Sequence, residues 1–224
     1  MQRPYHVGMV NVEPRLGPPR GVFVRHPFHI GYARLFQMVR PYTCVNYDIL
    51  LQMRSFLHDL DRRGVRGDVV EAGCWRGGCG AFMAAVAPHR TVRLYDSFDV
   101  FPPLKAEDGT YAQKLNIDVA TEADVQAVSD TLQVKPVVTR RFFKDLETFS
   151  GHIALLRLDG DLYDSTMDAL NAFYDAVVPG GYIVIDDFDF PGCRMALYDF
   201  FAERRIAPRI NPGGRFANAY FVKE

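Results

Sequence analysis

Two clusters of aspartates are the residues of this chain best suited to chemistry. Asp159 and Asp161 follow one strongly apolar run, and Asp186 and Asp187 follow the next. Carboxylates within hydrogen-bonding distance repel one another, so such a group needs either raised pKa values or a divalent cation between them. We favour the cation, because Mg²⁺ takes oxygen ligands and keeps open positions for water or substrate. Asp159, Asp186 and Asp187 are therefore the predicted metal ligands.

A magnesium ion at this place would help a bound hydroxyl to react. The cation lowers the pKa of the hydroxyl, because it stabilises the alkoxide or phenolate that must attack. Asp161, two residues beyond Asp159, is a candidate general base or a support for the ligands. Two other interpretations stay open: Asp161 could cap the helix that follows, and Asp187 could be a solvated loop residue.

A glycine-rich turn lies between the first predicted strand and the helix after it. Gly73 and Gly77 lack a Cβ and can adopt positive φ, so they let the backbone approach a ligand closely. Their spacing differs from the Gly-x-Gly-x-x-Gly of nicotinamide and flavin sites. Asp96 ends the second predicted strand, from which a carboxylate can accept both hydroxyls of a ribose.

The charges beside the glycine-rich turn indicate the kind of ligand. Glu71 adds a second carboxylate beside Asp96. Two carboxylates disfavour a phosphate-rich ligand and favour a cationic one with a ribose, for which S-adenosylmethionine is the candidate, since its sulfonium and ammonium are both positive. The alternative is a turn that only packs helix on strand, with Asp96 capping a local group.

The order of the predicted elements indicates an α/β fold. Alternating strands and helices predict a mostly parallel sheet between helix layers, whose ligands gather beyond the carboxyl ends of the strands. The pattern predicts strands at 68–71, 92–95, 137–139, 153–158 and 182–185, helices at 47–63, 81–87, 122–132, 163–177 and 194–204, and a closing β hairpin at 208–222. The segment 179–181, Pro-Gly-Gly, is expected to form a turn that ends the helix before it.

Composition narrows the function classes. The chain has 224 residues, enough for one domain with a substantial core, and a formal net charge of −1 makes a nucleic-acid partner a poor first guess. The four cysteines show no Cys-x-x-Cys spacing, which favours a reducing compartment, and we expect the cytoplasm. No run of about 18 apolar residues and no secretory signal is evident, so we expect no membrane partner.

Residues 1–40 differ from the remainder, 41–224, which we assign to one catalytic domain. They hold six arginines against one acid, Glu13, and five prolines, which predict that no long helix forms. We expect an arm that packs on the domain or on a neighbouring subunit in a homodimer, or else a lid over the site.

Four segments resemble the macrocin O-methyltransferase (TylF-like) family. They are Val-Glu-Ala-Gly-Cys-Trp-Arg-Gly-Gly at 70–78, Asp-Ser-Phe-Asp at 96–99, Leu-Leu-Arg-Leu-Asp-Gly-Asp-Leu-Tyr-Asp-Ser-Thr-Met-Asp-Ala-Leu at 155–170 and Pro-Gly-Gly-Tyr-Ile-Val-Ile-Asp-Asp-Phe at 179–188. The resemblance spans 42 to about 201, and it implies a Rossmann-like class I methyltransferase with a seven-stranded sheet.

The likeness also implies an activity and a site. It implies magnesium-dependent methylation of a hydroxyl by S-adenosylmethionine, usually on a sugar or aromatic part of a bacterial natural product. Asp159, Asp186 and Asp187 would hold the metal, and Asp159, Asp161 or a histidine would be the base. We assign the donor site to Thr43, Glu71, Gly73, Trp75, Gly77, Asp96, Ser97 and Phe142.

The chain departs from the family pattern in two places. It has Asp-Ser-Phe-Asp-Val-Phe-Pro at 96–102 where members usually carry Asp-Ser/Thr-Phe-Glu-Gly-Leu/Met-Pro, so the loop after Ser97 is expected to take another path. At 141–148 the family's Gly-Trp-Phe-x-Asp-Thr-Leu-Pro is weakened, although Phe142 can still stack on a base. The loop 101–121 is expected to act as a lid and, with the arm, to select the acceptor. Two alternative functions are a magnesium-dependent hydrolase using the same aspartates and a non-catalytic binding module.

Overall fold

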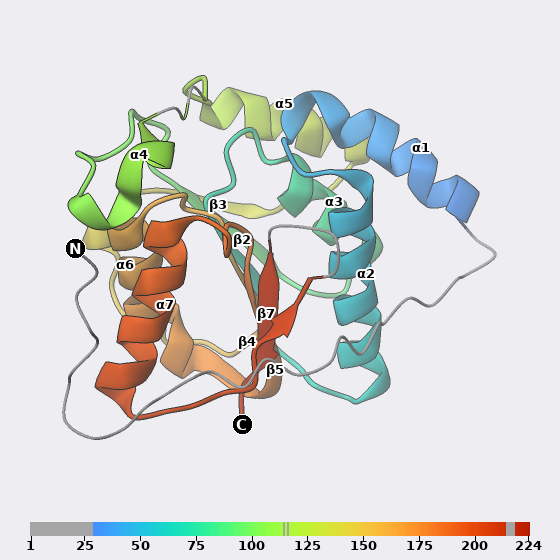
Figure 1. Ribbon diagram of the computed structural model, residues 1–224. Coiled ribbons are helices and arrows are strands. Elements are labelled where there is room, and N and C mark those ends of the chain that lie inside the picture. The colour runs from blue at the N-terminus through green and yellow to red at the C-terminus, as the bar shows by residue number, and fades with distance from the viewer. Residues whose placement is uncertain (1–28, 114, 116, 214–217) are drawn as a thin grey trace.

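A seven-stranded sheet runs through the molecule with helices on both sides, as the computed structural model shows for residues 29–113, 115, 117–213 and 218–224 (Figure 1). The strand order is β3-β2-β1-β4-β5-β7-β6; the first five strands are parallel, and β7 runs antiparallel to β5 and β6. The strands are β1 (Asp68–Ala72), β2 (Val92–Asp96), β3 (Val137–Arg140), β4 (Ile153–Leu158), β5 (Val177–Ile185), β6 (Asn211–Pro212) and β7 (Ala219–Val222). The predicted fold class and the antiparallel closing hairpin are confirmed.

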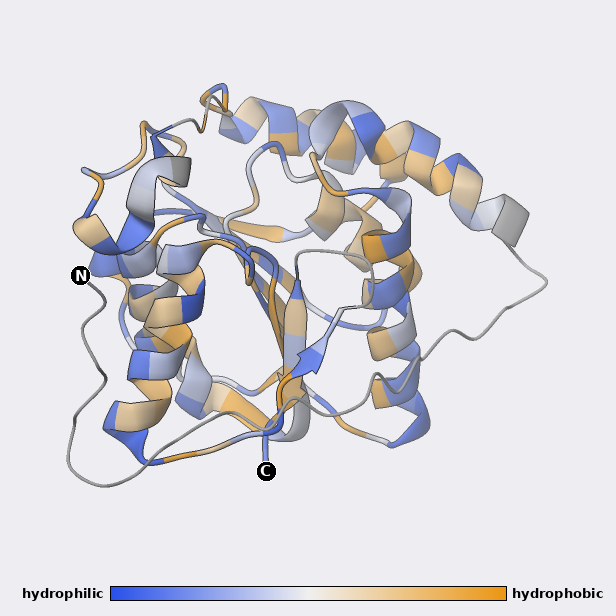
Figure 2. Cartoon of the chain, in the orientation of Figure 1, coloured by the Kyte–Doolittle hydropathy of each residue, from blue (hydrophilic) through white to orange (hydrophobic). Residues whose placement is uncertain are grey.

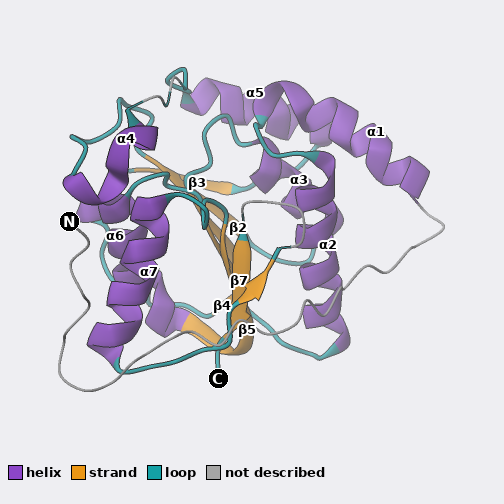
Figure 3. Ribbon diagram, viewed as in Figure 1, coloured by secondary structure: helices purple, strands orange, loops and turns teal. Residues whose placement is uncertain are grey.

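Two helix layers cover the sheet (Figure 3). The helices are α1 (His29–Val39), α2 (Tyr47–Arg62), α3 (Gly78–Val86), α4 (Gly109–Ala112), α5 (Glu122–Leu132), α6 (Tyr163–Phe173) and α7 (Pro191–Arg204). The helices α1, α2, α3 and α5 contact one another on one side, while α6 and α7 pack together on the other. Each layer has its own apolar cluster, and β4 between them is buried along its whole length, as expected for a parallel strand covered on both faces.

Helix α2 shows how local sequence sets an element of this layer. The side chain of Asn46 accepts hydrogen bonds from the backbone N–H groups of Asp48 and Ile49, which satisfies two of the free donors at the helix start. Six of its apolar residues recur at helical spacing and are buried, namely Ile49, Leu50, Met53, Phe56, Leu57 and Leu60. Figure 2 shows the mixture of apolar and hydrophilic residues along this helix. Gly64, at φ +69°, follows its end.

Helix α1 corrects the expectation that residues 1–40 form no long helix. It has 11 residues and packs against α3, α5 and α2. The last proline before it is Pro27, so the sequence from residue 28 onward has nothing that breaks a helix until Pro41. The rest of the predicted arm lies outside the described residues. None of the helices among the residues described here has the length and apolar character needed for a membrane span.

The segment 174–181 was also predicted wrongly. Helix α6 ends at Phe173, and the chain passes through a short 3₁₀ turn into β5, which already begins at Val177. Pro-Gly-Gly at 179–181 is not a separate turn but an irregularity inside the strand: Ile153 pairs with Val177, whereas Leu155 pairs with Tyr182. Gly180 makes this bulge possible because it adopts φ +82°.

Backbone hydrogen bonds extend the sheet beyond the strand ends. Asp159 N–H donates to the carbonyl of Ala72, and Asp186 N–H donates to the carbonyl of Leu158, each at 2.8 Å. These bonds set Asp159 beside the first glycine of the turn, Gly73, which has φ +94°. A Cβ at Gly73 would overlap the carbonyl oxygen of Asp159. The absence of a side chain at this position therefore lets the ends of β1 and β4 meet.

We expect the substitution Gly73→Ala to lower the free energy of unfolding by at least about 2 kcal/mol, because overpacking costs about 1–3 kcal/mol and positive φ adds about 1 kcal/mol. Urea denaturation followed by circular dichroism measures this. The matched control is Gly31→Ala in α1, where a Cβ meets nothing within 4 Å, so stability should stay the same or rise. Equal stability of the two variants would contradict the close approach at Gly73.

Candidate active site

A cavity of about 560 Å³ opens beyond the carboxyl ends of the parallel strands, where ligands of such sheets gather. Of the predicted site residues, Gly77 is the one that does not line it. The predicted residues that line it are Thr43, Glu71, Gly73, Trp75, Asp96, Ser97, Phe142, Asp159, Asp161, Asp186 and Asp187. The fold thus brings together residues that are up to 144 positions apart in the chain, from Thr43 to Asp187 (187 − 43 = 144).

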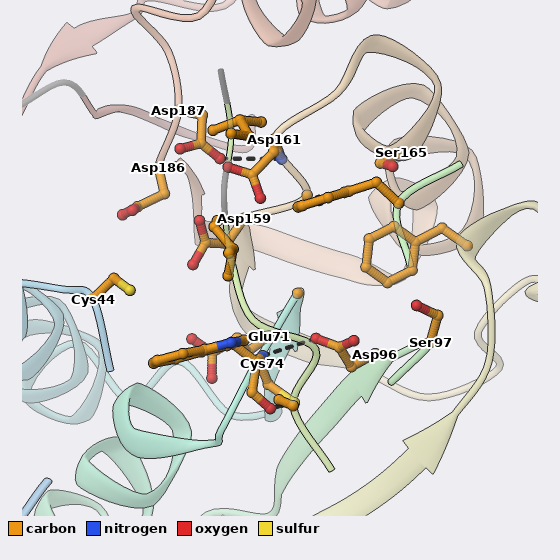
Figure 4. Close-up of a pocket in the computed structure, with 18 of the residues that line it drawn as sticks. Cys44, Glu71, Cys74, Asp96, Ser97, Asp159, Asp161, Ser165, Asp186 and Asp187 are labelled. Atoms are coloured by element: carbon orange, nitrogen blue, oxygen red, sulfur yellow. Dashed lines mark hydrogen bonds between the residues drawn. The ribbon is translucent and has the colours of Figure 1, made fainter. Parts of the chain in front are cut away.

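Three aspartates gather at the ends of β4 and β5 (Figure 4). One carboxylate oxygen from each of Asp159, Asp186 and Asp187 lies within 4.8 Å of the other two. Asp186 Oδ1 is buried and has no hydrogen-bond partner among the described residues, so it is an acceptor without a donor. Three hard oxygen donors with one such orphan fit a divalent cation such as Mg²⁺.

Burial and mutual repulsion shift the pKa values of this cluster. Burial raises the pKa of Asp186 to about 6, although the Arg157 guanidinium opposes the shift. Burial also raises the pKa of Asp187 well above its usual value, and the charges of Asp159 and Asp161 raise it further. A bound cation would stabilise the charged forms of these carboxyls and lower their pKa values again, so a metal ion fits this cluster.

Asp161 lies beside these three aspartates in an unusual backbone conformation. It has φ +62°, which a non-glycine residue rarely adopts, and its N–H donates to Asp187 Oδ2 at 3.3 Å. Burial, followed by the charge of Asp159, raises the pKa of its carboxyl to about 8. Trp75 and Phe98 also line the cavity at positive φ. Strain of this kind concentrates where side chains or amides must be aimed at a ligand.

Arg157 is a buried charged residue beside the aspartates that the sequence analysis does not predict to be part of the site. It lies in β4 with its side chain 1% exposed, and its guanidinium contacts Glu71, Asp159 and Asp186 at 2.6, 2.7 and 2.9 Å. A signal was available, because an arginine inside the apolar strand 153–158 must find anionic partners to be buried at all.

Glu71 lines the cavity, and its carboxylate is also bound by Arg157. It is completely buried, and Oε1 accepts the hydrogen bond from Arg157. A Cβ at Gly80 would lie 2.8 Å from Oε2, so that oxygen faces α3. Burial raises the pKa of Glu71 to about 7. Its carboxylate therefore serves first as the partner of Arg157.

Asp96 organises the other half of the cavity. Its two oxygens accept hydrogen bonds from the backbone N–H groups of Trp75 and Phe98, at 2.8 and 2.9 Å, which ties the loops after β1 and β2 to one carboxylate. Each oxygen keeps a further lone pair for a ligand hydroxyl. Trp75 Nε1 donates to the carbonyl of Asp118, so the indole connects this half to the predicted lid loop.

Packing between two helices explains why residue 77 is a glycine. It is the residue before α3, at φ +81°, and a Cβ there would lie 2.8 Å from a methyl group of Val125 in α5. Its lack of a side chain therefore allows α3 and α5 to pack closely.

The predicted lid loop is partly ordered by one buried aspartate. Asp108 accepts hydrogen bonds from the backbone N–H groups of Tyr163, at the start of α6, and of Lys105. Lys105 also pairs with Asp164. Val100, Phe101 and Val119 line the cavity although each is at least 39% exposed, so this loop offers apolar surface beside the acids.

Comparisons of the sequence and of the structure with known proteins both find O-methyltransferases. The family description Macrocin-O-methyltransferase (TylF) matches residues 39–214. The chain is 31% identical over 188 residues to mycinamicin III 3''-O-methyltransferase of Micromonospora griseorubida, covering 75% of this chain and 74% of that protein. It is 34% identical over 188 residues to demethyldecarbamoylnovobiocin O-methyltransferase of Streptomyces niveus, covering 75% and 71%. The solved structure of the O-methyltransferase NovP matches with a TM-score of 0.74 and 30% identity, over 81% of this chain and 82% of that one.

We predict that added Mg²⁺ raises the melting temperature more at pH 8 than near pH 5. Asp161 and Asp186 have folded-state pKa values of about 8 and 6, above the unfolded value of 3.8. Between about pH 4 and pH 8 the folded state therefore binds more protons than the unfolded state. The metal-free protein consequently loses stability as the pH rises towards 8. A cation removes this penalty. Differential scanning fluorimetry with MgCl₂ and with chelator measures it.

The control for this pH prediction is Asp161→Asn, which keeps the shape and tolerates positive φ. Without metal, the variant should melt higher than the parent protein at pH 8 and at about the same temperature near pH 5. The same Mg²⁺ effect at both pH values, together with no effect of the substitution, would show that these carboxyls do not carry the predicted charge penalty.

Proposed function

Because the chain belongs to the macrocin O-methyltransferase (TylF) family, we propose that it methylates a hydroxyl of a bacterial natural product with the aid of Mg²⁺ held by Asp159, Asp186 and Asp187. The methyl donor of this S-adenosylmethionine-dependent enzyme is bound on the Asp96 side of the cavity. The observation that carries the proposal is the meeting of three aspartate carboxylates beside a cavity that holds the family's donor motifs.

The cavity has one side with Asp159, Asp186 and Asp187 and another with Asp96, and we assign a different part of the reaction to each. When bound, Mg²⁺ would lower the pKa of the acceptor hydroxyl. Asp96 accepts hydrogen bonds from the ribose hydroxyls of the donor, and Phe142 stacks on its adenine. The donor methyl is already activated by its positive sulfur, so the remaining task of the protein is to align oxygen, methyl carbon and sulfur and to exclude water.

A carboxylate of the cluster takes the proton of the hydroxyl. Asp159 and Asp161 are the two candidates, because both line the cavity next to the proposed metal ligands. Asp161 is favoured by its place, because it lines the cavity and its N–H donates to Asp187 Oδ2 beside the proposed metal ligands. The histidines expected as alternative bases are His26 and His29 of the segment 1–40, and His26 lies outside the described residues.

The acceptor is proposed to be a sugar or aromatic part of a larger molecule. Two relatives support this class, because their names give mycinamicin III and demethyldecarbamoylnovobiocin as the molecules that they methylate. The apolar residues Val100, Phe101 and Val119 suit an acceptor with an apolar body. We also propose that the enzyme works in the cytoplasm as a homodimer with contacts through the segment 1–40, and light scattering of the full chain measures that oligomeric state.

We expect methyl transfer from labelled S-adenosylmethionine to glycosylated or phenolic acceptors, with loss of activity on thorough chelation and recovery on adding Mg²⁺. Liquid chromatography with mass detection of products that gain one methyl group measures it. Phosphate release from phosphate esters serves as the control for a hydrolase that uses the same aspartates, and it should be absent. Full activity after chelation would contradict the magnesium role.

We expect Asp159→Asn to lower kcat by at least about 10²-fold, because a metal ligand and a candidate base are lost together. Binding of S-adenosylhomocysteine by calorimetry should change little, since the donor half is untouched. The matched control is Asp189→Asn, an exposed aspartate near the same cluster, which should keep near-parental activity. If Asp159→Asn kept most of its rate, the ligand assignment would fail.

A further inference from the structure

A single buried arginine joins the ends of three strands beneath the three aspartates. Arg157 Nη1 donates to Glu71 Oε1 of β1 at 2.6 Å and to Asp159 Oδ2 after β4 at 2.7 Å. Nη2 lies 2.9 Å from Asp186 Oδ2 after β5. The planar guanidinium can hold several carboxylates in fixed directions at once, which a flexible ammonium cannot do.

The donors to the three aspartates come from different places. Arg157 holds Asp159 and Asp186 from below, whereas the N–H of Asp161 holds Asp187. Asp159 and Asp187 each accept a hydrogen bond that fixes the direction of the carboxylate, whereas Asp186 is held by its ion pair with Arg157 Nη2, which is not aligned as a hydrogen bond. In metal sites, such donors behind the ligands set ligand orientation and strongly influence metal affinity.

Glu71 is the third carboxylate bound to this guanidinium. Its side chain, like that of Arg157, is 1% exposed, and its Oε1 shares Arg157 Nη1 with Asp159 Oδ2. It also offsets the positive charge of Arg157. The surplus of negative charge among the aspartates is then left to attract a cation, which a free guanidinium beside the site would otherwise repel.

We propose that Arg157, held in place by Glu71, is a positioning residue that aims the carboxylates of Asp159 and Asp186 at the metal. This rests on the proposed function, because it presupposes that these aspartates bind Mg²⁺. The competing explanation is that the buried pair serves only stability. The two explanations differ in what happens when the pair is replaced as a unit, since a buried ion pair contributes little net stability over an apolar replacement of similar size.

The first test uses two variants that keep the net charge of the cluster. Arg157→Lys keeps the positive charge but loses the planar fork. The double variant Glu71→Gln with Arg157→Met removes one charge of each sign. In both, we expect the affinity for Mg²⁺, measured by calorimetry without donor, to fall by about 10- to 100-fold, which is typical for loss of a donor behind a ligand. In Arg157→Lys, S-adenosylhomocysteine affinity should stay within about 3-fold, and in both variants kcat should recover partly at high Mg²⁺.

The matched control is Arg90→Lys, the same substitution at another buried arginine, whose partners are Asp61 and the carbonyls of Val65 and Gly67 at the opposite end of the sheet. It should lower the melting temperature without changing Mg²⁺ affinity. If a variant of Arg157 does not fold, the decision falls to Glu71→Asp, which keeps the charge but shortens the side chain and so loosens Arg157, and which should weaken Mg²⁺ binding.

The outcomes separate this inference from the proposed function. If the parent protein itself does not bind Mg²⁺, the proposed metal role is wrong. If the parent protein binds Mg²⁺ and Asp159→Asn does not, while the folded variants of Arg157 and Glu71 bind it within about 2-fold of the parent, the metal role stands and the positioning role is overturned.

Discussion

Repulsion between carboxylates that the sheet forces together is the constraint on which this structure depends. The parallel ladders of β1, β4 and β5 end at the same edge, so the acids that follow them must share one small volume. One guanidinium, that of Arg157, offsets part of this charge from within the core. The other carboxylate oxygens line the cavity, where they would suit a cation.

The same edge also explains how two kinds of cation fit one cavity. The aspartates after β4 and β5 suit a hard divalent ion, while Asp96 after β2 is stabilised by backbone N–H groups and is left to accept hydrogen bonds. A sulfonium donor can therefore lie between the two halves in a field that is negative on both sides. Backbone strain at Trp75, Phe98 and Asp161 surrounds this space, which indicates that the loops are held in directions set by the site rather than by local preference.

Sequence patterns predict an element best where the spacing of its apolar residues agrees with the residues that begin and end it. Helix α2 was predicted almost to the residue, because its cap, its apolar spacing and its end all point the same way. The segment 174–181 was predicted wrongly, because Pro-Gly-Gly gives the same signal for a turn as for a bulge inside a strand, and only pairing with β4 distinguishes them. Helix α1 is not predicted by the density of prolines in residues 1–40, because all five prolines lie before the helix begins.

By itself, the sequence determined the fold class, the family and the aspartates at the strand ends, because these depend on short motifs and on periodicities of apolar residues. The tertiary structure decided which charges meet. Nothing local in the chain says that Glu71 turns inward to Arg157, or that Arg157 reaches the acids of two other strands. Those contacts depend on strand order and register, which are set by the packing of the whole sheet between its two helix layers.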